Sequence, residues 1–261
     1  MSRIKAVVFD WAGTMIDFGS FAPMGAFVEA FSEFGIDVSI EEARAPMGKA
    51  KRDHITAMMT TERVSALWRE RFGHAPGDAD IDRVYEVFVP MNEKVAADYA
   101  DLVPGALETI AYLKSKHIRI GSTTGYTRSI MAHVLPVAAR QGYEPENLVC
   151  ADDMPEGRPV PLGMYKCFVD LGVYPPSCVI KVDDTGPGIG EGVAAGCVTV
   201  GVALSGNYVG KTPEELARLP DEEISFLREA AAAKLRAAGA DHVIDTVADL
   251  PKLIGTLERS G

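Results

Sequence analysis

The sequence predicts an α/β fold in which a doubly wound, mainly parallel sheet carries an inserted helical segment. From about residue 102 onward, short apolar segments alternate with helical patterns, as they do in βαβ proteins. The segments are apolar at consecutive positions, which indicates strands that are buried on both faces. About 100 residues separate the first apolar segment from the second, and most of them have helical periodicity. We therefore expect a sheet-containing core and a separate α-helical cap.

Six segments are expected to form the strands of the core. They are Ile4–Phe9, Ile118–Thr123, Leu148–Ala151, Val179–Val182, Val198–Val202 and, at an edge of the sheet, His242–Asp245. Helical patterns occupy 105–116, 127–140, 160–171 and 188–195. A later helical stretch at 213–238 breaks near Pro220, and Thr212 followed by Glu215 has the pattern of a capping box at its start.

The interval between the first two strands is expected to form the cap. Apolar residues recur at helical spacing in 21–34, 41–45, 49–59, 61–72 and 79–99. We therefore divide the chain into a core, 1–19 and 102–261, and a cap, 20–101. The apolar face of the helix near 21–34 predicts either self-association or a helix buried within one chain, and periodicity does not distinguish the two.

Composition and charge exclude several classes of protein. With 261 residues, 47% of them hydrophobic, the chain can bury a sizeable core and is too apolar to be disordered. A formal charge of −11 argues against an extended nucleic-acid-binding surface. No apolar stretch is long enough to span a membrane, and the one before Asp10 is too short for a signal peptide. The four cysteines lack metal-ligand spacing, so we expect them to be reduced in a cytoplasmic protein.

Acidic residues follow two of the expected strands at their carboxyl ends, where ligands bind in such sheets. Asp10 follows the first strand, and Asp183 and Asp184 follow the strand at Val179–Val182. A carboxylate in this position can serve as a nucleophile or a metal ligand. An Asp that only caps the following turn has the same local pattern, so that alternative stays open for each of them.

Two loops could contact a phosphoryl group. Segment 122–126 (STTGY) offers hydroxyl and backbone N–H donors, although a capped helix start has the same pattern. Segment 157–159 (GRP) carries a guanidinium, a preferred partner of phosphate, although a loop arginine is usually solvated. Together with the acidic strand ends, these groups predict a Mg²⁺-assisted phosphoryl-transfer site.

The order and spacing of these four elements resemble the haloacid dehalogenase-like superfamily over nearly the whole chain. The resemblance implies a Rossmann-like core with a helical cap inserted after the first strand. Phosphatases of this superfamily usually have an acid–base Asp two residues after the nucleophile, where this chain has Ala12. Many members also have an acidic residue where this chain has Gly188, so that metal contact is either lost or supplied by Asp183.

The cap contains a lysine that could replace the missing acid. Segment 46–54 (PMGKAKRDH) opens a helix on which Lys51, Ile55 and Met58 share one face, with His54 beside them. A lysine on an apolar face is desolvated, which lowers its pKa and suits it to form an imine. The alternative is a lysine that packs its stem and extends its amine into solvent.

Together, the motifs resemble the phosphonoacetaldehyde hydrolase family of that superfamily. The resemblance implies hydrolysis of the P–C bond of phosphonoacetaldehyde to acetaldehyde and phosphate, in 2-aminoethylphosphonate degradation. It implies Asp10 as the nucleophile, Lys51 as the imine-forming residue and His54 as a proton shuttle or water activator. It implies a Mg²⁺ ion held by Asp10, the carbonyl of Ala12 and Asp184. The substrate-binding residues that it implies are Met47, Gly48, Thr124, Gly125, Tyr126 and Arg158.

Two other functions remain open. One is a Mg²⁺-dependent phosphatase of phosphate esters, which Ala12 and Lys51 disfavour. The other is a non-catalytic phosphometabolite-binding protein of the same fold, which the presence of Asp10 disfavours. The resemblance also implies a homodimer formed through the cap. The expected partners are otherwise a small-molecule phosphonate, with neither nucleic acid nor membrane.

Overall fold

In the computed structural model, which describes residues 4–259, five parallel strands form a sheet in the order β2-β1-β3-β4-β5. They are β1 (Ala6–Phe9), β2 (Arg119–Ser122), β3 (Val179–Asp183), β4 (Val198–Val202) and β5 (His242–Ile244). The chain runs from β1 outward to β2 and then returns to the other side through β3. The strand order therefore reverses beside β1, where such sheets bind ligands. The doubly wound fold class is confirmed.

The expected strand at Leu148–Ala151 is wrong. The segment makes only an isolated parallel bridge, between Thr123 and Val149. The backbone N–H of Cys150 donates to the carboxylate of Asp153 at 2.7 Å, and the chain then turns into the short helix η2 (Ala151–Asp153). The next N–H that faces β2, that of Ala151, donates to the carbonyl of Tyr126 in the following loop at 3.0 Å, and the segment makes no further bridge within residues 4–259. The strand that leads to Asp184 is therefore the third, not the fourth.

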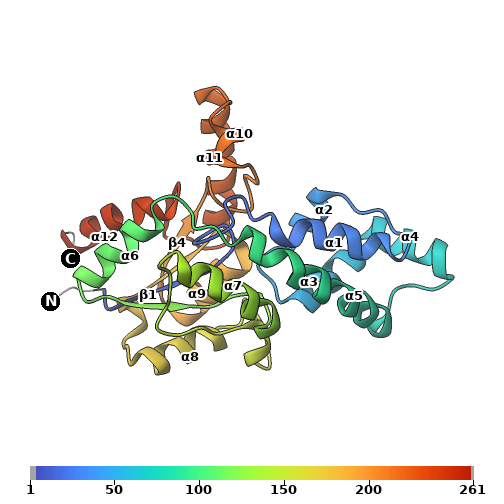
Figure 1. The fold of residues 1–261 in the computed structure, drawn as a ribbon, viewed down its shortest axis with the longest axis horizontal. Helices are drawn as coiled ribbons and strands as arrows, with labels where there is room; N and C mark the ends of the chain where they lie inside the picture. Colours follow the sequence, from blue (N-terminus) through green and yellow to red (C-terminus); the bar gives the residue numbers. More distant parts are fainter. Residues whose placement is uncertain (1–3, 260–261) are drawn as a thin grey trace.

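Helices cover both faces of the sheet (Figure 1). One face carries α6 (Ala106–Ser115), α7 (Arg128–Arg140) and α12 (Leu250–Arg259). The other carries α8 (Leu162–Leu171), α9 (Gly186–Ala195) and α11 (Asp221–Ala237). Along β1, Val7 and Phe9 pack into the first layer while Ala6 and Val8 pack into the second, because successive side chains of a strand point to opposite faces. The sequence reasoning did not predict α12.

The remaining elements of the core are short. They are α10 (Pro213–Leu216), η3 (Pro176–Cys178) and η4 (Val247–Asp249). The capping box at the start of α10 is confirmed: the N–H of Glu215 donates to Thr212 Oγ1 at 3.1 Å, and the N–H of Thr212 donates to Glu215 Oε2 at 2.8 Å. All four cysteines are free, as expected.

The long interval after β1 is helical, and its helices form a lobe at the end of the molecule opposite the termini (Figure 1). Its elements are α1 (Ala22–Ser32), α2 (Ile40–Arg44), α3 (Lys51–Met59), α4 (Glu62–Phe72), α5 (Asp78–Ala96) and η1 (Ala97–Tyr99). We call α1 to α5 the cap helices. They share an apolar cluster that is separate from those of the sheet, and its large members include Phe27, Phe31, Trp68 and Phe88.

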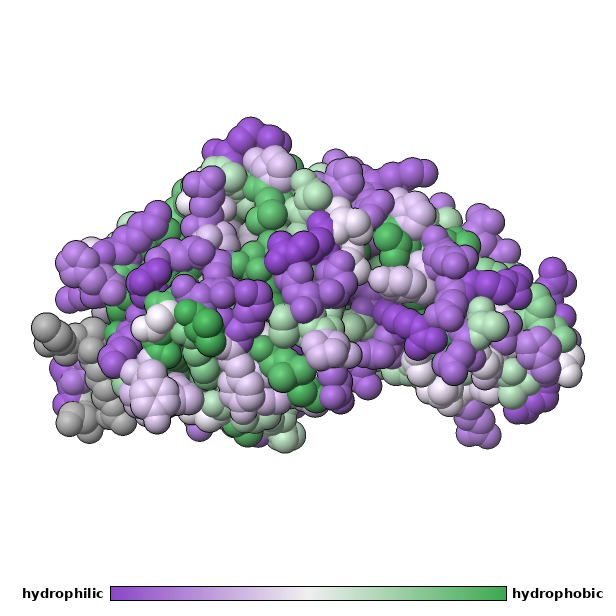
Figure 2. All heavy atoms as spheres, turned by 90° about the horizontal axis from the view of Figure 1, so that it is seen from below, coloured by the Kyte–Doolittle hydropathy of each residue, from purple (hydrophilic) through white to green (hydrophobic). Residues whose placement is uncertain are grey.

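The apolar face of α1 is buried within the chain. Its Phe27 ring stacks on Phe88 of α5, with ring centres 4.2 Å apart. The intrachain alternative from the sequence is therefore confirmed, and this face gives no support to self-association. The surface seen in Figure 2 mixes polar and apolar residues over both lobes. Within residues 4–259, none of the helices combines the length and apolarity needed to cross a bilayer.

Candidate active site

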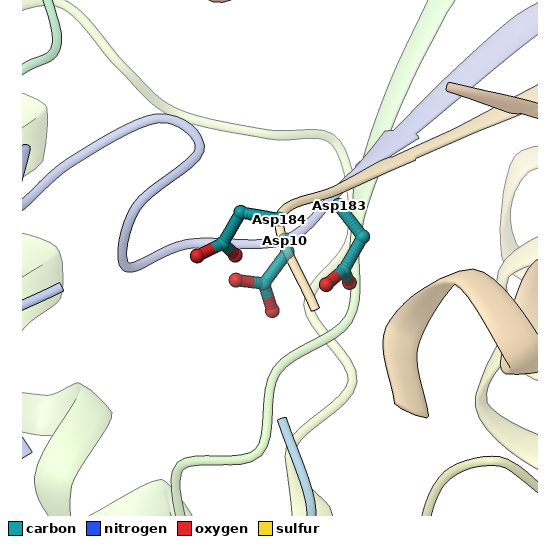
Figure 3. Close-up of side chains that lie close together, drawn as sticks. All are labelled: Asp10, Asp183 and Asp184. Carbon is teal, nitrogen blue, oxygen red and sulfur yellow. The ribbon is translucent and has the colours of Figure 1, made fainter. Parts of the chain in front are cut away.

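Three carboxylates meet at the carboxyl ends of β1 and β3 (Figure 3). They belong to Asp10, Asp183 and Asp184, and one oxygen of each lies within 4.8 Å of the other two. All three side chains are buried. The N–H of Asp10 donates to the carbonyl of Val182 at 2.9 Å, which holds the two strand ends side by side. The expected convergence of acidic strand ends is confirmed.

This crowding perturbs the carboxylates. Burial, with a further contribution from Asp183, raises the pKa of Asp10 to about 6. Burial and its two acidic neighbours raise the pKa of Asp184 well above its usual value. Burial alone would also raise the pKa of Asp183, but Lys181 and Arg158 outweigh it and lower that pKa. The negative charge of these buried carboxylates is only partly compensated by neighbouring cations. Their oxygens are suitable ligands for a hard divalent cation, so these residues fit Mg²⁺.

The packing explains the absence of an acidic residue at position 188. A Cβ added to Gly188 would lie 1.9 Å from Asp183 Oδ2, so the carboxylate of Asp183 already fills that space. Asp183 is held there by the N–H and hydroxyl of Thr185, which donate to its Oδ1 at 3.0 and 2.7 Å. The carboxylate of Asp183 thus occupies the space that a side chain at position 188 would need.

Arg158 lies beside Asp10. Its Nη1 donates to Asp10 Oδ1 at 2.8 Å and is 3.4 Å from Asp183 Oδ2. Only 8% of the residue is exposed, so the alternative of a solvated loop arginine is wrong. A buried guanidinium beside the carboxylates provides the local positive charge that an anionic ligand needs in a protein of net charge −11.

Of the serine and threonine hydroxyls in 122–126, only that of Thr124 is free to donate to a ligand, and the hydroxyl of Tyr126 has no hydrogen-bond partner within residues 4–259. Ser122 Oγ donates to a backbone carbonyl at 3.0 Å, and Thr123 Oγ1 donates to Glu191 at 2.8 Å. Thr124 Oγ1 accepts from the N–H of Tyr126 at 3.1 Å and keeps its own proton. Helix α7 is capped by Thr127, not by any of these residues. The hydroxyls of Ser122 and Thr123 are therefore engaged within the protein, and contact of this loop with a phosphoryl group stays a prediction for Thr124 and Tyr126.

Lys51 is buried at the first turn of α3, with 3% of the residue exposed. Its Nζ lies 4.8 Å from the ring centre of Tyr126 and 5.6 Å from that of Phe27. Among residues 4–259 its amine has no carboxylate within salt-bridge distance. Burial lowers its pKa to about 7. The alternative of a lysine that extends its amine into solvent is wrong.

His54 follows Lys51 by three residues and is fully buried. Its Nε2 lies 2.8 Å from the carbonyl oxygen of Ala43, and because a carbonyl only accepts, Nε2 must carry the proton. Nδ1 then has a free lone pair, and within the described chain it has no hydrogen-bond partner. Burial, reinforced by Lys51, keeps the pKa of His54 well below its usual value, so the imidazole is neutral.

A pocket lies between the cap helices and the core. It brings together nine residues predicted from the sequence, namely Asp10, Ala12, Met47, Gly48, Lys51, Thr124, Gly125, Tyr126 and Arg158. Four lining residues were not predicted, namely Ser20, Pro23, Lys49 and Thr185. Of the other predicted residues, His54 lies behind Lys51 on α3, and Asp183 and Asp184 lie beside Asp10.

Glycine at position 48 allows the cap to lie directly on the core. Gly48 has φ of +91°, and a Cβ there would lie 2.1 Å from Thr185 Oγ1. Any other residue would therefore both strain the backbone and push the two parts apart. On the core side, a Cβ added to Gly125 would lie 2.8 Å from the carbonyl oxygen of Lys49. Both glycines permit backbone contact across the pocket.

The sequence reasoning missed a second contact between the cap helices and the core. Arg44, at the end of α2, donates from Nη1 to the carbonyl of Gly19 at 2.8 Å and to Asn207 Oδ1 at 3.2 Å. The backbone N–H of Asn207 in turn donates to Asp184 Oδ2 at 2.7 Å. No local motif marks Arg44, because its partner Asn207 is 163 positions away.

Comparison with known proteins identifies the family of the chain. The family profile of haloacid dehalogenase-like hydrolases matches residues 4–196. The phosphonoacetaldehyde hydrolase of Paraburkholderia phytofirmans is 53% identical over 258 residues, which cover 99% of this chain and 97% of that protein. The one from Paraburkholderia xenovorans is 52% identical, with the same coverage. A crystal structure of a phosphonoacetaldehyde hydrolase-like protein from Oleispira antarctica has a TM-score of 0.97 at 42% identity, covering 99% of this chain and 94% of that one.

The chain therefore belongs to the haloacid dehalogenase-like hydrolases and, among them, to the family of these phosphonoacetaldehyde hydrolase relatives.

Proposed function

We propose that the protein hydrolyses the P–C bond of phosphonoacetaldehyde to give acetaldehyde and phosphate. The observation that carries the proposal is the buried amine of Lys51, which lines the same pocket as Asp10 and Arg158. A phosphatase of phosphate esters has no use for such an amine, whereas an aldehyde substrate does. The names of the relatives agree with this choice of substrate.

The reaction begins with the aldehyde. The neutral amine of Lys51 adds to the carbonyl carbon, and loss of water gives an imine that is then protonated. The low pKa of Lys51, about 7 as a result of burial, makes the neutral amine abundant at neutral pH. The lone pair on Nδ1 of His54 supports proton transfer during this step, because His54 is neutral and lies on the same helix.

The P–C bond breaks in the second step. A carboxylate oxygen of Asp10 attacks phosphorus, and the electron pair of the P–C bond moves into the protonated imine to give an enamine. This electron sink makes an acid at position 12 unnecessary, because the leaving atom is carbon and not oxygen. Arg158, with Nη1 at 2.8 Å from Asp10, lies where it can offset the charge of the phosphoryl group.

Hydrolysis then restores both residues. Water attacks phosphorus in the aspartyl phosphate, which releases phosphate and the carboxylate of Asp10. The enamine takes a proton at carbon, and a second water hydrolyses the resulting imine to acetaldehyde and the free amine of Lys51. In total, one phosphonoacetaldehyde and one water give one acetaldehyde and one phosphate.

We further propose that the cofactor is Mg²⁺, held by Asp10, the carbonyl of Ala12 and Asp184, with Asp183 as an additional candidate. When bound, the ion would neutralise charge on the phosphoryl oxygens. The buried carboxylate cluster supports this assignment. The remaining substrate contacts that we propose come from Met47, Gly48, Thr124, Gly125 and Tyr126.

Three further expectations from the sequence stay predictions. They are the division into a core, 1–19 and 102–261, and a cap, 20–101; a homodimer formed through the cap; and a cytoplasmic location. Light scattering would test the second, and a monomeric mass would contradict it.

The proposal is tested by measuring acetaldehyde release with a coupled dehydrogenase. Borohydride reduction in the presence of substrate should leave a covalent label, the reduced imine, on the peptide that contains Lys51. Lys51→Arg should abolish both the label and the turnover, whereas Lys166→Arg, on the outer side of α8, should retain both. Full activity in Lys51→Arg would exclude the imine, and preferential hydrolysis of phosphate esters by the native protein would favour the phosphatase alternative.

A further inference from the structure

Beneath the pocket lies a buried polar cluster to which no role has yet been assigned. It consists of Thr123 after β2, Lys181 in β3 and Glu191 in α9, and we call these three residues the Arg158 frame. Their exposed fractions are 2%, 0% and 2%. Buried charges are costly unless they are paired, so their presence here needs a reason beyond packing.

The frame fixes the orientation of the guanidinium. Nε of Arg158 donates to Glu191 Oε2 at 3.0 Å, and Nη2 donates to Thr123 Oγ1 at 2.6 Å. With Nη1 bonded to Asp10, all three nitrogens have a partner, so the plane of the group is set. A guanidinium has five N–H groups. Within residues 4–259, each terminal nitrogen makes one hydrogen bond and so has one further N–H, and Nη1 also lies 3.4 Å from Asp183 Oδ2.

Thr123 is the centre of the frame. Its hydroxyl accepts from Arg158 Nη2 at 2.6 Å and from Lys181 Nζ at 2.7 Å, and it donates to Glu191 Oε2 at 2.8 Å. A hydroxyl has one proton and two lone pairs, so its capacity is fully used. The group can therefore adopt only one hydrogen-bonded orientation, and it is not available to substrate.

Lys181 keeps the charge of Arg158 available. Glu191 alone would pair with Arg158 and cancel much of its charge. Nζ of Lys181 lies 3.3 Å from Glu191 Oε2 and 3.1 Å from Asp183 Oδ2, so it offsets both carboxylates. Arg158 can then direct its charge towards Asp10 and an anionic ligand.

Two glycines make room for the frame. A Cβ at Gly163 would lie 2.6 Å from Glu191 Oε1, and one at Gly192 would lie 2.7 Å from Cβ of Lys181. The neighbouring helices α8 and α9 thus leave space for the two buried charged side chains.

We propose that Thr123, Lys181 and Glu191 are positioning residues that hold Arg158 for the phosphoryl group and have no part in imine formation. The inference rests on the proposed function for the identity of the substrate. The frame touches Arg158 and the acidic cluster, but none of its hydrogen bonds or ion pairs within residues 4–259 reaches Lys51. Its loss should therefore weaken binding of the phosphoryl group and leave aldehyde chemistry at Lys51 intact.

The test uses two probes, each of which resembles half of the substrate. Inorganic phosphate, titrated by calorimetry in buffer with Mg²⁺, reports on Arg158. Acetaldehyde with borohydride, followed by mass spectrometry, reports on Lys51. Thr123→Val removes the hydroxyl with little change of shape. Thr199→Val is the matched control, because Thr199 is also buried in the sheet but its hydroxyl bonds to Gly239 and Asp241, away from the pocket.

Thr123→Val should weaken phosphate binding by about 10-fold or more, the usual effect of losing a hydrogen bond to a charged group. Trapping of acetaldehyde at Lys51 should stay within about 2-fold of the native protein, and Thr123→Ser should restore phosphate binding, because it restores the bond. Glu191→Gln, which keeps the shape and removes the charge, should have the same split effect and replaces Thr123→Val if the latter does not fold.

Phosphate affinity unchanged in both Thr123→Val and Glu191→Gln would overturn the inference. A parallel loss of phosphate binding and acetaldehyde trapping would also overturn it, because the frame would then support the whole pocket. If the native protein binds phosphate but releases no acetaldehyde from phosphonoacetaldehyde, the proposed function fails, while the phosphate titrations still decide whether the frame acts through Arg158.

Discussion

The amine of Lys51 should titrate near pH 7, and this prediction tests the central physical argument. A lysine ordinarily has a pKa of 10.5, and burial of Lys51 between the rings of Phe27 and Tyr126 lowers it to about 7. The neutral form is the one that attacks a carbonyl. The rate of imine formation should therefore rise with pH and level off above about pH 7, not above pH 10.

The magnitude follows from the two pKa values. At pH 7 an amine with a pKa of about 7 is half neutral, whereas one with a pKa of 10.5 is neutral in about one molecule in 3,000. Burial thus increases the reactive fraction by a factor of about 10³. The same lowering means that the folded protein gives up part of its stability to keep this amine out of water.

The assay is reductive trapping of acetaldehyde at Lys51 by cyanoborohydride between pH 5.5 and 10, read by mass spectrometry. Lys114, an exposed lysine on α6, is labelled in the same sample and serves as the reference. The ratio of the two rates cancels the pH dependence of the reductant. A ratio that does not change between pH 5.5 and 10 would refute the argument, because Lys51 would then show no sign of a lowered pKa.

Four other changes have defined outcomes. Lys51→Met should stabilise the protein below pH 7 by up to about 5 kcal/mol, at 1.36 kcal/mol for each unit by which burial lowers the pKa. The gain should shrink as the pH rises from 7 to 10.5, because the unfolded state binds more protons than the folded state in this range. Equal gains in the free energy of unfolding at pH 6 and pH 9, measured by denaturant melts, would contradict this. Gly48→Ala should lower kcat/KM about 100-fold or more without changing the helical circular dichroism, because its Cβ would lie 2.1 Å from Thr185 Oγ1. Arg44→Gln should raise KM about 10-fold by loosening the cap, whereas Arg63→Gln, an exposed arginine bonded to Glu42, should not, and equal KM values would count against the contact. Chelation of divalent cations should abolish acetaldehyde release from phosphonoacetaldehyde. The rate of acetaldehyde trapping at Lys51 should stay within about 3-fold of that of the untreated protein, because in the proposed mechanism the carboxylates act on phosphorus and not on the aldehyde. Loss of trapping would contradict this separation of roles.

The features that could be predicted from the sequence are those carried by local patterns. Asp10, Asp183 and Asp184 were predicted to meet because the carboxyl ends of neighbouring parallel strands share one edge of the sheet. Lys51 was predicted to be buried because its helical spacing places it on the same face as Ile55 and Met58. In both cases, a few neighbouring positions and a regular geometry were sufficient.

The features that were missed depend on contacts between distant parts of the chain. Arg44 and Asn207 lie 163 positions apart, and neither belongs to a recognisable motif. Thr123 and Thr124 are adjacent in the same loop, and the local pattern does not distinguish them. In the fold, Thr123 belongs to the buried frame and Thr124 lines the pocket. The segment at Leu148–Ala151 has the composition of a strand, but the N–H of Ala151 donates to the carbonyl of Tyr126 in the loop after β2, and the pairing stops after one bridge.

The positions of Ala12, Gly48 and Lys51 are connected by one physical requirement. Breaking a bond to carbon calls for a place to put electrons, and not for an acid beside an oxygen, so a side chain without a proton to give is acceptable at Ala12. The electron sink has to reach the substrate from the side opposite the carboxylates, because an amine held among three acidic groups would stay protonated. Placing Lys51 in the apolar cap satisfies this condition, and the contact of Gly48 with Thr185 brings it down to the core. In the proposed mechanism the cap is therefore part of the chemistry, and any change that separates it from the core should stop turnover while leaving the carboxylate cluster and Arg158 unchanged.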